Sequence, residues 1–156
     1  MKVLFLCNAN MCRSPLAEGL LKLIFKEKNI DGFVDSAGFE AYHINETPYE
    51  HTIRKAQNQG IDISTKRVRL FSQTDFDKFD RIYVMDTLAY RNAIEFARND
   101  EDKAKVDFLM NVVNPGKNEP VPVPHAQSED DYDQTYMLLH EACEKIAESI
   151  TKEQLI

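Results

Sequence analysis

The sequence predicts an α/β fold, a single doubly wound domain with a four-stranded parallel sheet and helices on both faces. Short apolar segments rich in β-branched residues alternate with longer segments whose apolar residues recur at helical spacing. Strands and helices that alternate in this way form a parallel sheet, with crossover helices packed on both of its faces. A length of 156 residues is enough for one well-packed core, so we expect one domain over 1–156.

The first predicted strand is the apolar run 3–6, and a polar loop separates it from a predicted helix over 16–26. Ser14 is well placed as the N-cap of this helix and Pro15 as its first residue. The unpaired N–H groups and positive dipole end of a helix N-terminus bind phosphate-like anions. The loop has no glycine-rich run and no Gly-Lys-Ser/Thr ending, so we expect an anion site that differs from a nucleotide-binding loop.

The chemistry expected of this loop is covalent, because Cys7 begins it and Arg13 follows six positions later. A helix N-terminus and a guanidinium both stabilise the thiolate, so Cys7 is the predicted nucleophile. Arg13 can donate two parallel hydrogen bonds to phosphoryl oxygens. The Ser14 hydroxyl is within plausible reach of the sulfur and would stabilise the thiolate. The intervening residues would surround the anion with backbone N–H groups: Asn8, Ala9, Asn10, Met11 and Cys12.

The two asparagines of the loop have a conformational explanation. So tight a loop normally needs left-handed backbone, and the loop contains no glycine. Asparagine tolerates that conformation best among the other residues. We therefore expect Asn8 and Asn10 to serve the backbone, with Asn10 holding the shape of the loop.

The rest of the chain continues the alternation. Further strands are predicted at 32–38, 80–85 and 105–110, and further helices at 48–59, 87–99 and 129–152. Ligands of open parallel sheets bind at the carboxyl ends of the strands, where the loop after residue 6 lies. The proline-rich stretch 111–128 lacks periodicity and is a long loop, and loops of that length usually have a function.

Several residues outside the loop carry weaker predictions. Lys66, Arg67 and Arg69 form a small basic patch, interpreted first as solvated surface and second as a substrate contact. Cys143 lies on the apolar face of the last helix and is assigned to core packing. No two histidines have metal-ligand spacing, so no metal site is expected. The histidines divide into helical surface residues, His51 and His140, and residues of loops that border the site, His43 and His125.

The charge and composition argue against several classes of partner. A net charge of -7 is unfavourable for nucleic acid or an acidic membrane surface. The N-terminal apolar run is too short for a signal peptide or a membrane span, and three cysteines give no disulfide framework. The cytoplasm is the expected location.

The segment CNANMCRSP, directly after a VLFL strand, closely resembles the low-molecular-weight protein tyrosine phosphatases. The resemblance covers nearly the whole chain and ends in an acidic-aromatic helix. Further matches are the DSAG segment at 35–38, the turn at Gly60 and Ile61, and the FDRIYVMD segment at 79–86. The resemblance implies a single phosphatase domain over the whole chain.

Within that domain, the resemblance implies a phosphate-binding loop at 7–14 and a long site-bordering loop at 111–128. The implied reaction is hydrolysis of aryl phosphate monoesters through a phosphocysteine intermediate on Cys7, without a metal or a cofactor. Its substrates would be phosphotyrosine proteins or small aryl phosphates, with inorganic phosphate as product.

The resemblance also implies roles for three further residues. Tyr42 matches the aromatic wall that flanks the phosphotyrosine ring, although a surface tyrosine that covers the edge of the core is the alternative. Asp86 matches an aspartate that braces the phosphate loop. Cys12 is implied to form a reversible protective disulfide with Cys7, and simple packing explains Cys12 equally well.

The chain departs from the family in the long loop. The family has Asp-Pro-aromatic there, and the aspartic acid protonates the departing oxygen. Counted back from Tyr132 and Tyr136, that position is occupied by Val123, which cannot transfer a proton. His125 and Asp130 are the candidate replacements, and Asp130 has an alternative role beside the positive end of the last helix.

Two other functions remain open. A catalytically weak module that binds phosphate or phosphotyrosine would keep the loop and lack the acid. A thiol-dependent arsenate reductase would use the same loop, but that reaction needs further cysteines, and Cys143 on a core face is a poor candidate.

Overall fold

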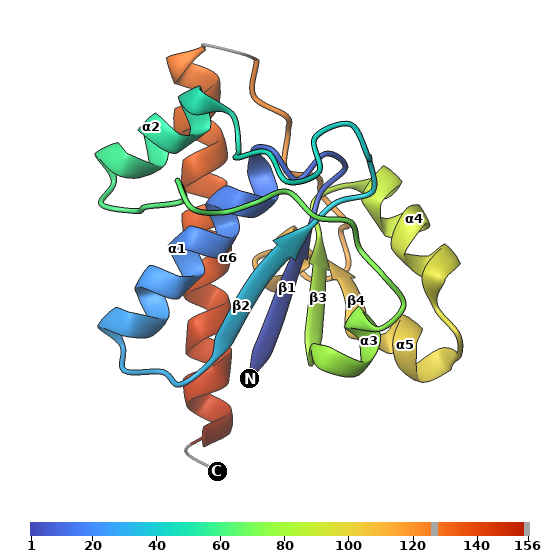
Figure 1. Cartoon of the computed structure of the whole chain (residues 1–156). Helices are drawn as coiled ribbons and strands as arrows, with labels where there is room; N and C mark the ends of the chain where they lie inside the picture. Colours follow the sequence, from blue (N-terminus) through green and yellow to red (C-terminus); the bar gives the residue numbers. More distant parts are fainter. Residues whose placement is uncertain (126–127, 155–156) are drawn as a thin grey trace.

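A four-stranded, all-parallel sheet forms the centre of the computed structural model, in the order β2-β1-β3-β4 (Figure 1). The structure describes residues 1–125 and 128–154. The strands are β1 (Lys2–Leu6), β2 (Phe33–Ala37), β3 (Arg81–Val84) and β4 (Val106–Phe108). The predicted fold class is therefore confirmed.

Helices cover both faces of the sheet (Figure 1). One face is covered by α1 (Arg13–Glu27) and α6 (Glu129–Gln154), with α2 (Glu50–Asn58) beside them. On the other side lie α3 (Asp75–Lys78), α4 (Thr87–Phe96) and α5 (Asp100–Lys105). This two-sided cover explains why the central strands lack apolar-polar alternation.

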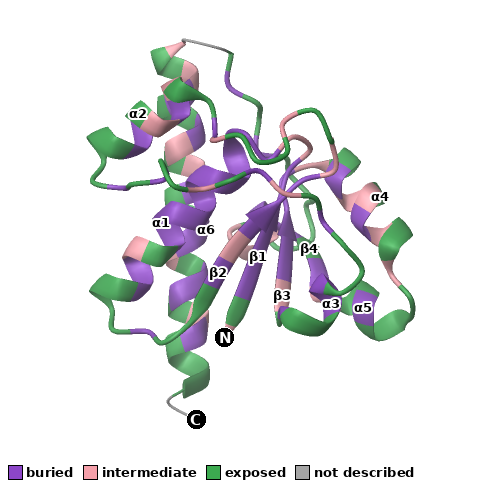
Figure 2. Cartoon of the chain, in the orientation of Figure 1, coloured by how far each residue is buried: buried purple, intermediate pink, exposed green. Residues whose placement is uncertain are grey.

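The first strand supplies both cores. Val3 and Phe5 pack in the cluster with α1 and α6, and Leu4 and Leu6 pack in the cluster with α4. All four side chains are fully buried, and Figure 2 shows the inner parts of the strands in the same state. Burial on both faces fixes β1 rigidly, so the loop that follows residue 6 starts from an immobile point.

Three sequence predictions about element boundaries were wrong. Ser14 is not an N-cap, because α1 already begins at Arg13, with Cys12 in the cap position and no side-chain cap hydrogen bond. The predicted helix 87–99 ends at Phe96, and a separate helix, α5, follows at Asp100–Lys105 after Asn99, which accepts a hydrogen bond from the Asp102 N–H as its N-cap. The predicted strand 105–110 ends at 108, where a 3-10 turn, η1 (Leu109–Val112), begins.

The described part of the long loop, 113–125, returns to the carboxyl end of the sheet. The Val121 N–H donates a hydrogen bond of 2.7 Å to the carbonyl of Met85, directly after β3. This contact brings the following residues next to the loop between β1 and α1. None of the helices in the described ranges has both the length and the apolar character to cross a bilayer.

Candidate active site

The candidate site is the loop 7–14, which runs from the end of β1 into the first turn of α1 at the carboxyl edge of the sheet (Figure 1). Cys7 is 3% exposed and Arg13 is 5% exposed. Asn8 and Ala9 are half-buried, and every other residue of the loop is buried. The solvent-facing edge of the loop is therefore at Asn8 and Ala9.

Asn10 holds the loop in its shape. Its φ of 58° is left-handed, whereas Asn8 has no positive φ, so only Asn10 of the two asparagines serves that purpose. The Asn10 side chain is fully buried, and its Oδ1 accepts a hydrogen bond from the Arg69 N–H at 3.2 Å. That bond fixes which end of the amide donates.

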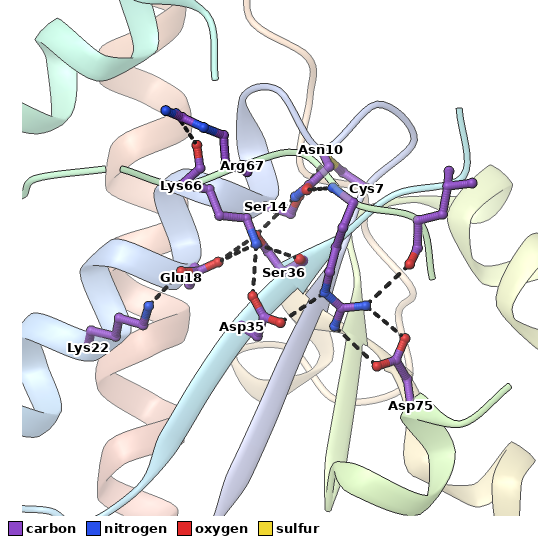
Figure 3. Close-up of polar contacts among 12 residues, drawn as sticks. Cys7, Asn10, Ser14, Glu18, Lys22, Asp35, Ser36, Lys66, Arg67 and Asp75 are labelled. Atoms are coloured by element: carbon purple, nitrogen blue, oxygen red, sulfur yellow. Dashed lines mark hydrogen bonds and ion pairs between the residues drawn. The ribbon is translucent and has the colours of Figure 1, made fainter. Parts of the chain in front are cut away.

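A series of hydrogen bonds connects the Glu18 carboxylate to the Cys7 sulfur, with the Asn10 amide as the donor at its centre (Figure 3). Ser36 Oγ donates to Glu18 Oε1 at 2.7 Å and accepts from Asn10 Nδ2 at 2.9 Å. The second proton of Asn10 Nδ2 goes to Ser14 Oγ at 2.9 Å. The Ser14 proton is then left for Cys7 Sγ, which lies 2.9 Å from Ser14 Oγ. A donor aimed at the sulfur stabilises its thiolate.

Lys66 stabilises the carboxylate end of this chain. Its Nζ lies 3.1 Å from Glu18 Oε1 and 2.8 Å from Asp35 Oδ1, and it donates to the Ser36 carbonyl at 2.7 Å. Burial pushes the pKa of Asp35 upward, but the hydrogen bond and charge of Lys66, with the charge of Arg69, outweigh it and lower that pKa. Asp35 and Glu18 are thus paired charges in the folded protein.

The predicted solvated basic patch is therefore wrong for two of its three members. The Lys66 side chain is only 9% exposed in its carboxylate pairs. Arg69 contacts Asp35 at 2.9 Å and both oxygens of Asp75 at 3.1 Å. Arg67 alone is exposed. Lys66 and Arg69 are therefore held in ion pairs next to the loop, the Lys66 side chain nearly buried and the Arg69 side chain 32% exposed.

The guanidinium of Arg13 uses only one of its three nitrogens for contacts with described protein groups. Nη1 donates to Asp86 Oδ2 at 2.8 Å and to the Val121 carbonyl at 2.7 Å, which uses both of its protons. Nε and Nη2 have no partner among the described residues, and no unpartnered side-chain nitrogen there is buried. These two nitrogens are thus reachable from solvent, with the parallel geometry that binds two phosphoryl oxygens.

Asp86 serves two elements at once. One carboxylate oxygen accepts the Arg13 hydrogen bond, and Oδ1 accepts from the Ala89 N–H at 2.9 Å as the N-cap of α4. Both oxygens are committed, so the residue orients Arg13 and has no free position for proton transfer.

The segment after β2 packs directly on the loop, a contact that sequence reasoning missed. A Cβ on Gly38 would lie 2.8 Å from the Asn8 carbonyl oxygen and 2.9 Å from the Asn10 nitrogen, so only glycine fits. The N–H groups of Phe39 and Glu40 donate to the Asn8 carbonyl at 2.8 and 3.2 Å. Asn8 Nδ2 donates to Glu40 Oε1 at 2.5 Å. The small residues at 36–38 were the available signal.

Two aromatic residues, Tyr42 and Tyr49, lie in the segment between β2 and α2. Tyr42, the predicted wall residue, is 90% exposed, so it does not cover the edge of the core. Tyr49, which sequence reasoning did not select, donates its N–H to the Met11 carbonyl at 3.0 Å and is 47% exposed. His43 lies beside Tyr49, with ring centroids 6.2 Å apart.

Cys12 lies in a different environment from Cys7. Burial raises the pKa of Cys12, more than hydrogen bonds with Thr52 and Tyr132 lower it. The Tyr132 hydroxyl lies 3.0 Å from Thr52 Oγ1, and burial raises the pKa of Tyr132 to about 12. Cys12 and Cys7 are both free thiols. The environment of Cys12 therefore favours the neutral thiol.

Two further sequence predictions concern residues on the helices. Cys143 is fully buried between α6 and α1, as predicted, and burial raises its pKa. His51 is not a simple surface residue, because its ring packs on Tyr132 at 4.6 Å and its Nε2 lies 3.2 Å from Glu129.

The two candidate acids do not contact the loop 7–14 in the part of the chain that the structure describes. His125 is exposed, and its backbone N–H donates to Asp131 Oδ2 at 2.9 Å. Asp130 is exposed in the first turn of α6. Val123 is 66% exposed and lies two residues beyond the Val121 carbonyl that binds Arg13.

The chain combines a doubly wound parallel sheet with a loop at its carboxyl edge that has a cysteine at one end and an arginine near the other. The model of the family "Low molecular weight phosphotyrosine protein phosphatase" matches residues 2–155. The chain therefore belongs to this family of hydrolases.

Individual proteins agree with this assignment. YfkJ of Bacillus subtilis, a low molecular weight protein-tyrosine-phosphatase, is 29% identical over 97% of both chains. The low molecular weight phosphotyrosine protein phosphatase of Schizosaccharomyces pombe is 30% identical over 96% of both chains. The crystal structure of a protein tyrosine phosphatase from Entamoeba histolytica, with Hepes in its active site, has a TM-score of 0.89 at 26% identity and covers 99% of both chains.

Proposed function

We propose that the chain hydrolyses aryl phosphate monoesters, phosphotyrosine in proteins or small aryl phosphates, through a phosphocysteine intermediate on Cys7. The observation that carries the proposal is the Ser14 hydroxyl 2.9 Å from the Cys7 sulfur, where it can donate to the thiolate. The names of the relatives, which are phosphotyrosine phosphatases, support the same substrate class.

In the first step, Cys7 Sγ attacks the phosphorus and the bond from phosphorus to the aryl oxygen breaks. Arg13 Nε and Nη2 and the loop N–H groups bind the phosphoryl oxygens, whose charge spreads in the transition state. In the second step, water attacks the phosphocysteine and inorganic phosphate forms. Sulfur leaves as a thiolate, which the Ser14 hydroxyl stabilises. Arg13 supplies the positive charge, so the proposal invokes no metal or cofactor.

The departing oxygen of tyrosine also needs a proton, and the proposal includes the loss of the usual donor. Val123 stands where the family has its aspartic acid, in a segment that Val121 attaches to Arg13. General acid catalysis typically contributes about 10²- to 10⁴-fold. A different group must supply the proton, or hydrolysis of phosphotyrosine is slow.

Val123 at the position of the general acid also favours one alternative function, a module that binds phosphate or phosphotyrosine with little turnover. Arsenate reduction has less support, because a relay needs a second accessible thiol. Cys143 is fully buried against α1 and cannot serve without unfolding of that contact.

The test compares two esters, phosphotyrosine and an aryl phosphate with a strongly activated phenol, with Cys7→Ser as control. Hydrolysis of the activated ester, with a phosphoryl adduct on Cys7 trapped by acid quench, is the expected result for the wild type. The Cys7→Ser variant should lose at least about 10⁴-fold in kcat. Phosphate binding without turnover of either ester would leave the binding module as the function.

A further inference from the structure

The structure holds one carboxylate against the solvent-facing edge of the phosphate loop. Glu40 follows β2, and its Oε1 accepts a hydrogen bond of 2.5 Å from Asn8 Nδ2. The Glu40 backbone N–H also donates a hydrogen bond of 3.2 Å to the Asn8 carbonyl. Side chain and backbone of Glu40 are thus both fixed relative to the loop.

The second oxygen of Glu40 is free. Within residues 1–125 and 128–154 it has no hydrogen-bond partner and no cation in ion-pair contact, and no unpartnered side-chain oxygen there is buried. An amide N–H that donates to Oε1 leaves Oε2 as the oxygen that carries the proton when the acid is neutral. The free oxygen therefore faces solvent at the edge of the loop.

The other carboxylates near the loop are unsuitable as proton donors. Asp86 has both oxygens committed, to Arg13 and to the Ala89 N–H. Glu18 is buried behind the loop and paired with Lys22 and Lys66. Among the three carboxylates compared, Glu40 is the one hydrogen-bonded at the solvent-facing edge of the loop with a free oxygen in the described part of the chain.

The direction of the reaction points to the same edge. An in-line attack by Cys7 Sγ places the departing oxygen on the far side of phosphorus from the sulfur. Cys7 lies at the buried bottom of the loop, and Asn8 and Ala9 form its half-buried edge. The departing oxygen thus points away from the buried sulfur and toward solvent, and Asn8 holds Glu40 at the solvent-facing edge of the same loop.

We propose that Glu40 is the proton donor to the leaving group, in place of the aspartic acid that Val123 has replaced. As the P–O bond breaks, its electron pair goes to the aryl oxygen and the proton moves from Glu40 Oε2 to that oxygen. The resulting Glu40 carboxylate takes a proton from the water that attacks the phosphocysteine. The Cys7 thiolate leaves, and Glu40 is again protonated. The proposal rests on the proposed phosphatase function.

The test is Glu40→Gln, assayed on phosphotyrosine and on the activated aryl phosphate. Glutamine keeps an oxygen to accept the Asn8 hydrogen bond and has no transferable proton. We expect kcat/KM for phosphotyrosine to fall by about 10²- to 10⁴-fold and that for the activated ester by less than about 3-fold, since an activated phenol departs without a proton. Added formate should restore part of the phosphotyrosine activity of Glu40→Ala.

The matched control is Glu46→Gln, an exposed glutamate of the same segment that contacts His43. It should leave both activities unchanged. An equal loss on both esters in Glu40→Gln would assign Glu40 to loop structure alone, and no loss on either ester would remove it from the mechanism. Both outcomes overturn the assignment.

Failure of the phosphatase function itself is visible separately. If the wild type forms no phosphocysteine with the activated ester, the proposed function fails before any Glu40 variant is made. If the adduct forms and Glu40→Gln behaves as the wild type, only the role of Glu40 fails.

Discussion

The two sides of the site differ in how firmly they are held. The loop 7–14 has mostly buried side chains, linked through Asn10, Ser36 and Glu18 to the nearly buried ammonium of Lys66. The segment 121–125 has two hydrogen bonds at Val121 and two to α6, from Thr135 Oγ1 to the Pro122 carbonyl at 3.4 Å and from the His125 N–H to Asp131 at 2.9 Å. A cavity of about 260 Å³ lies between this segment and α6. In the proposed reaction, the loop 7–14 is the fixed side, which holds the phosphate, the nucleophile and Glu40. The segment 121–125 is the variable side, which would lie near the departing oxygen.

The largest expected effect comes from the fixed side, with Arg13→Lys. Lysine keeps the positive charge but loses the paired Nε and Nη2 donors. Its single nitrogen cannot bind Asp86 and Val121, as Nη1 of Arg13 does, and contact the phosphoryl oxygens at the same time. We expect kcat to fall by about 10²- to 10³-fold on both esters, because the lost contacts are to transition-state oxygens.

Steady-state kinetics on the two esters measures this effect. A loss confined to phosphotyrosine would contradict the assignment of Arg13 to the phosphoryl group, which the two substrates share. Arg67→Lys, on the exposed arginine behind the loop, is the control and should have wild-type kinetics.

The variable side is tested by Val123→Asp, which should increase activity. A carboxyl group at 123 would stand in a segment attached to Arg13, and its side chain has room because Val123 is 66% exposed. We expect kcat on phosphotyrosine to rise by about 10-fold in the wild type, and by up to about 10²-fold in Glu40→Gln, where no donor remains.

The same kinetics on the activated ester is the internal control, because that ester needs no proton and should not respond. An unchanged rate on phosphotyrosine in both backgrounds would show that position 123 does not reach the leaving group. Activity would then depend on Glu40 alone.

Sequence reasoning came closer to the observed geometry on the fixed side than on the variable side, for physical reasons. Cys7, Arg13 and their loop follow from local chain geometry, a buried strand that runs directly into a helix. Glu40 contacts Asn8, 32 positions earlier in the chain, and Val121 contacts Arg13, 108 positions earlier. No local sequence pattern encodes such distant pairings. Lys66 was misassigned for the same reason, since its carboxylate partners Glu18 and Asp35 are distant in sequence.

A smaller effect is expected from Gly38→Ala, whose added methyl group would clash with the backbone of the loop 7–14. The added Cβ would meet backbone atoms of Asn8, Ala9 and Asn10 at 2.8 to 3.0 Å, and backbone cannot rotate away as a side chain can. We expect a loss of about 1–3 kcal/mol in the free energy of unfolding. The displaced loop should also lower kcat on both esters.

Chemical denaturation and the kinetics of the two esters measure the two parts. Gly60→Ala is a useful comparison, because Gly60 has open space around it and only its φ of 77° is at stake. That variant should lose stability and keep kcat. Equal kcat losses in both variants would mean that the loop does not sense the contact at Gly38.

The smallest expected effect is a pH dependence that comes from Asp35 behind the loop. Its folded pKa is lowered against burial by Lys66 and Arg69, relative to an ordinary aspartate value of about 3.9. A lowered folded pKa stabilises the protein above the unfolded value, and that stabilisation is lost as pH falls through the folded pKa. Stability should thus begin to decline near about pH 5 and keep falling below the ordinary aspartate value of about 3.9, until the folded carboxylate is protonated.

Asp35→Asn removes this group and leaves Lys66 with Glu18 as its remaining carboxylate. We expect this variant to lose about 1–3 kcal/mol at neutral pH and to show a shallower decline below about pH 5, measured by urea unfolding at several pH values. Asp31→Asn, on an exposed aspartate, should follow the wild type. A parallel decline in wild type and Asp35→Asn would place the acid sensitivity elsewhere. The packing of Lys66 and Arg69 next to the loop would then matter more for stability than their ion pairs with Asp35.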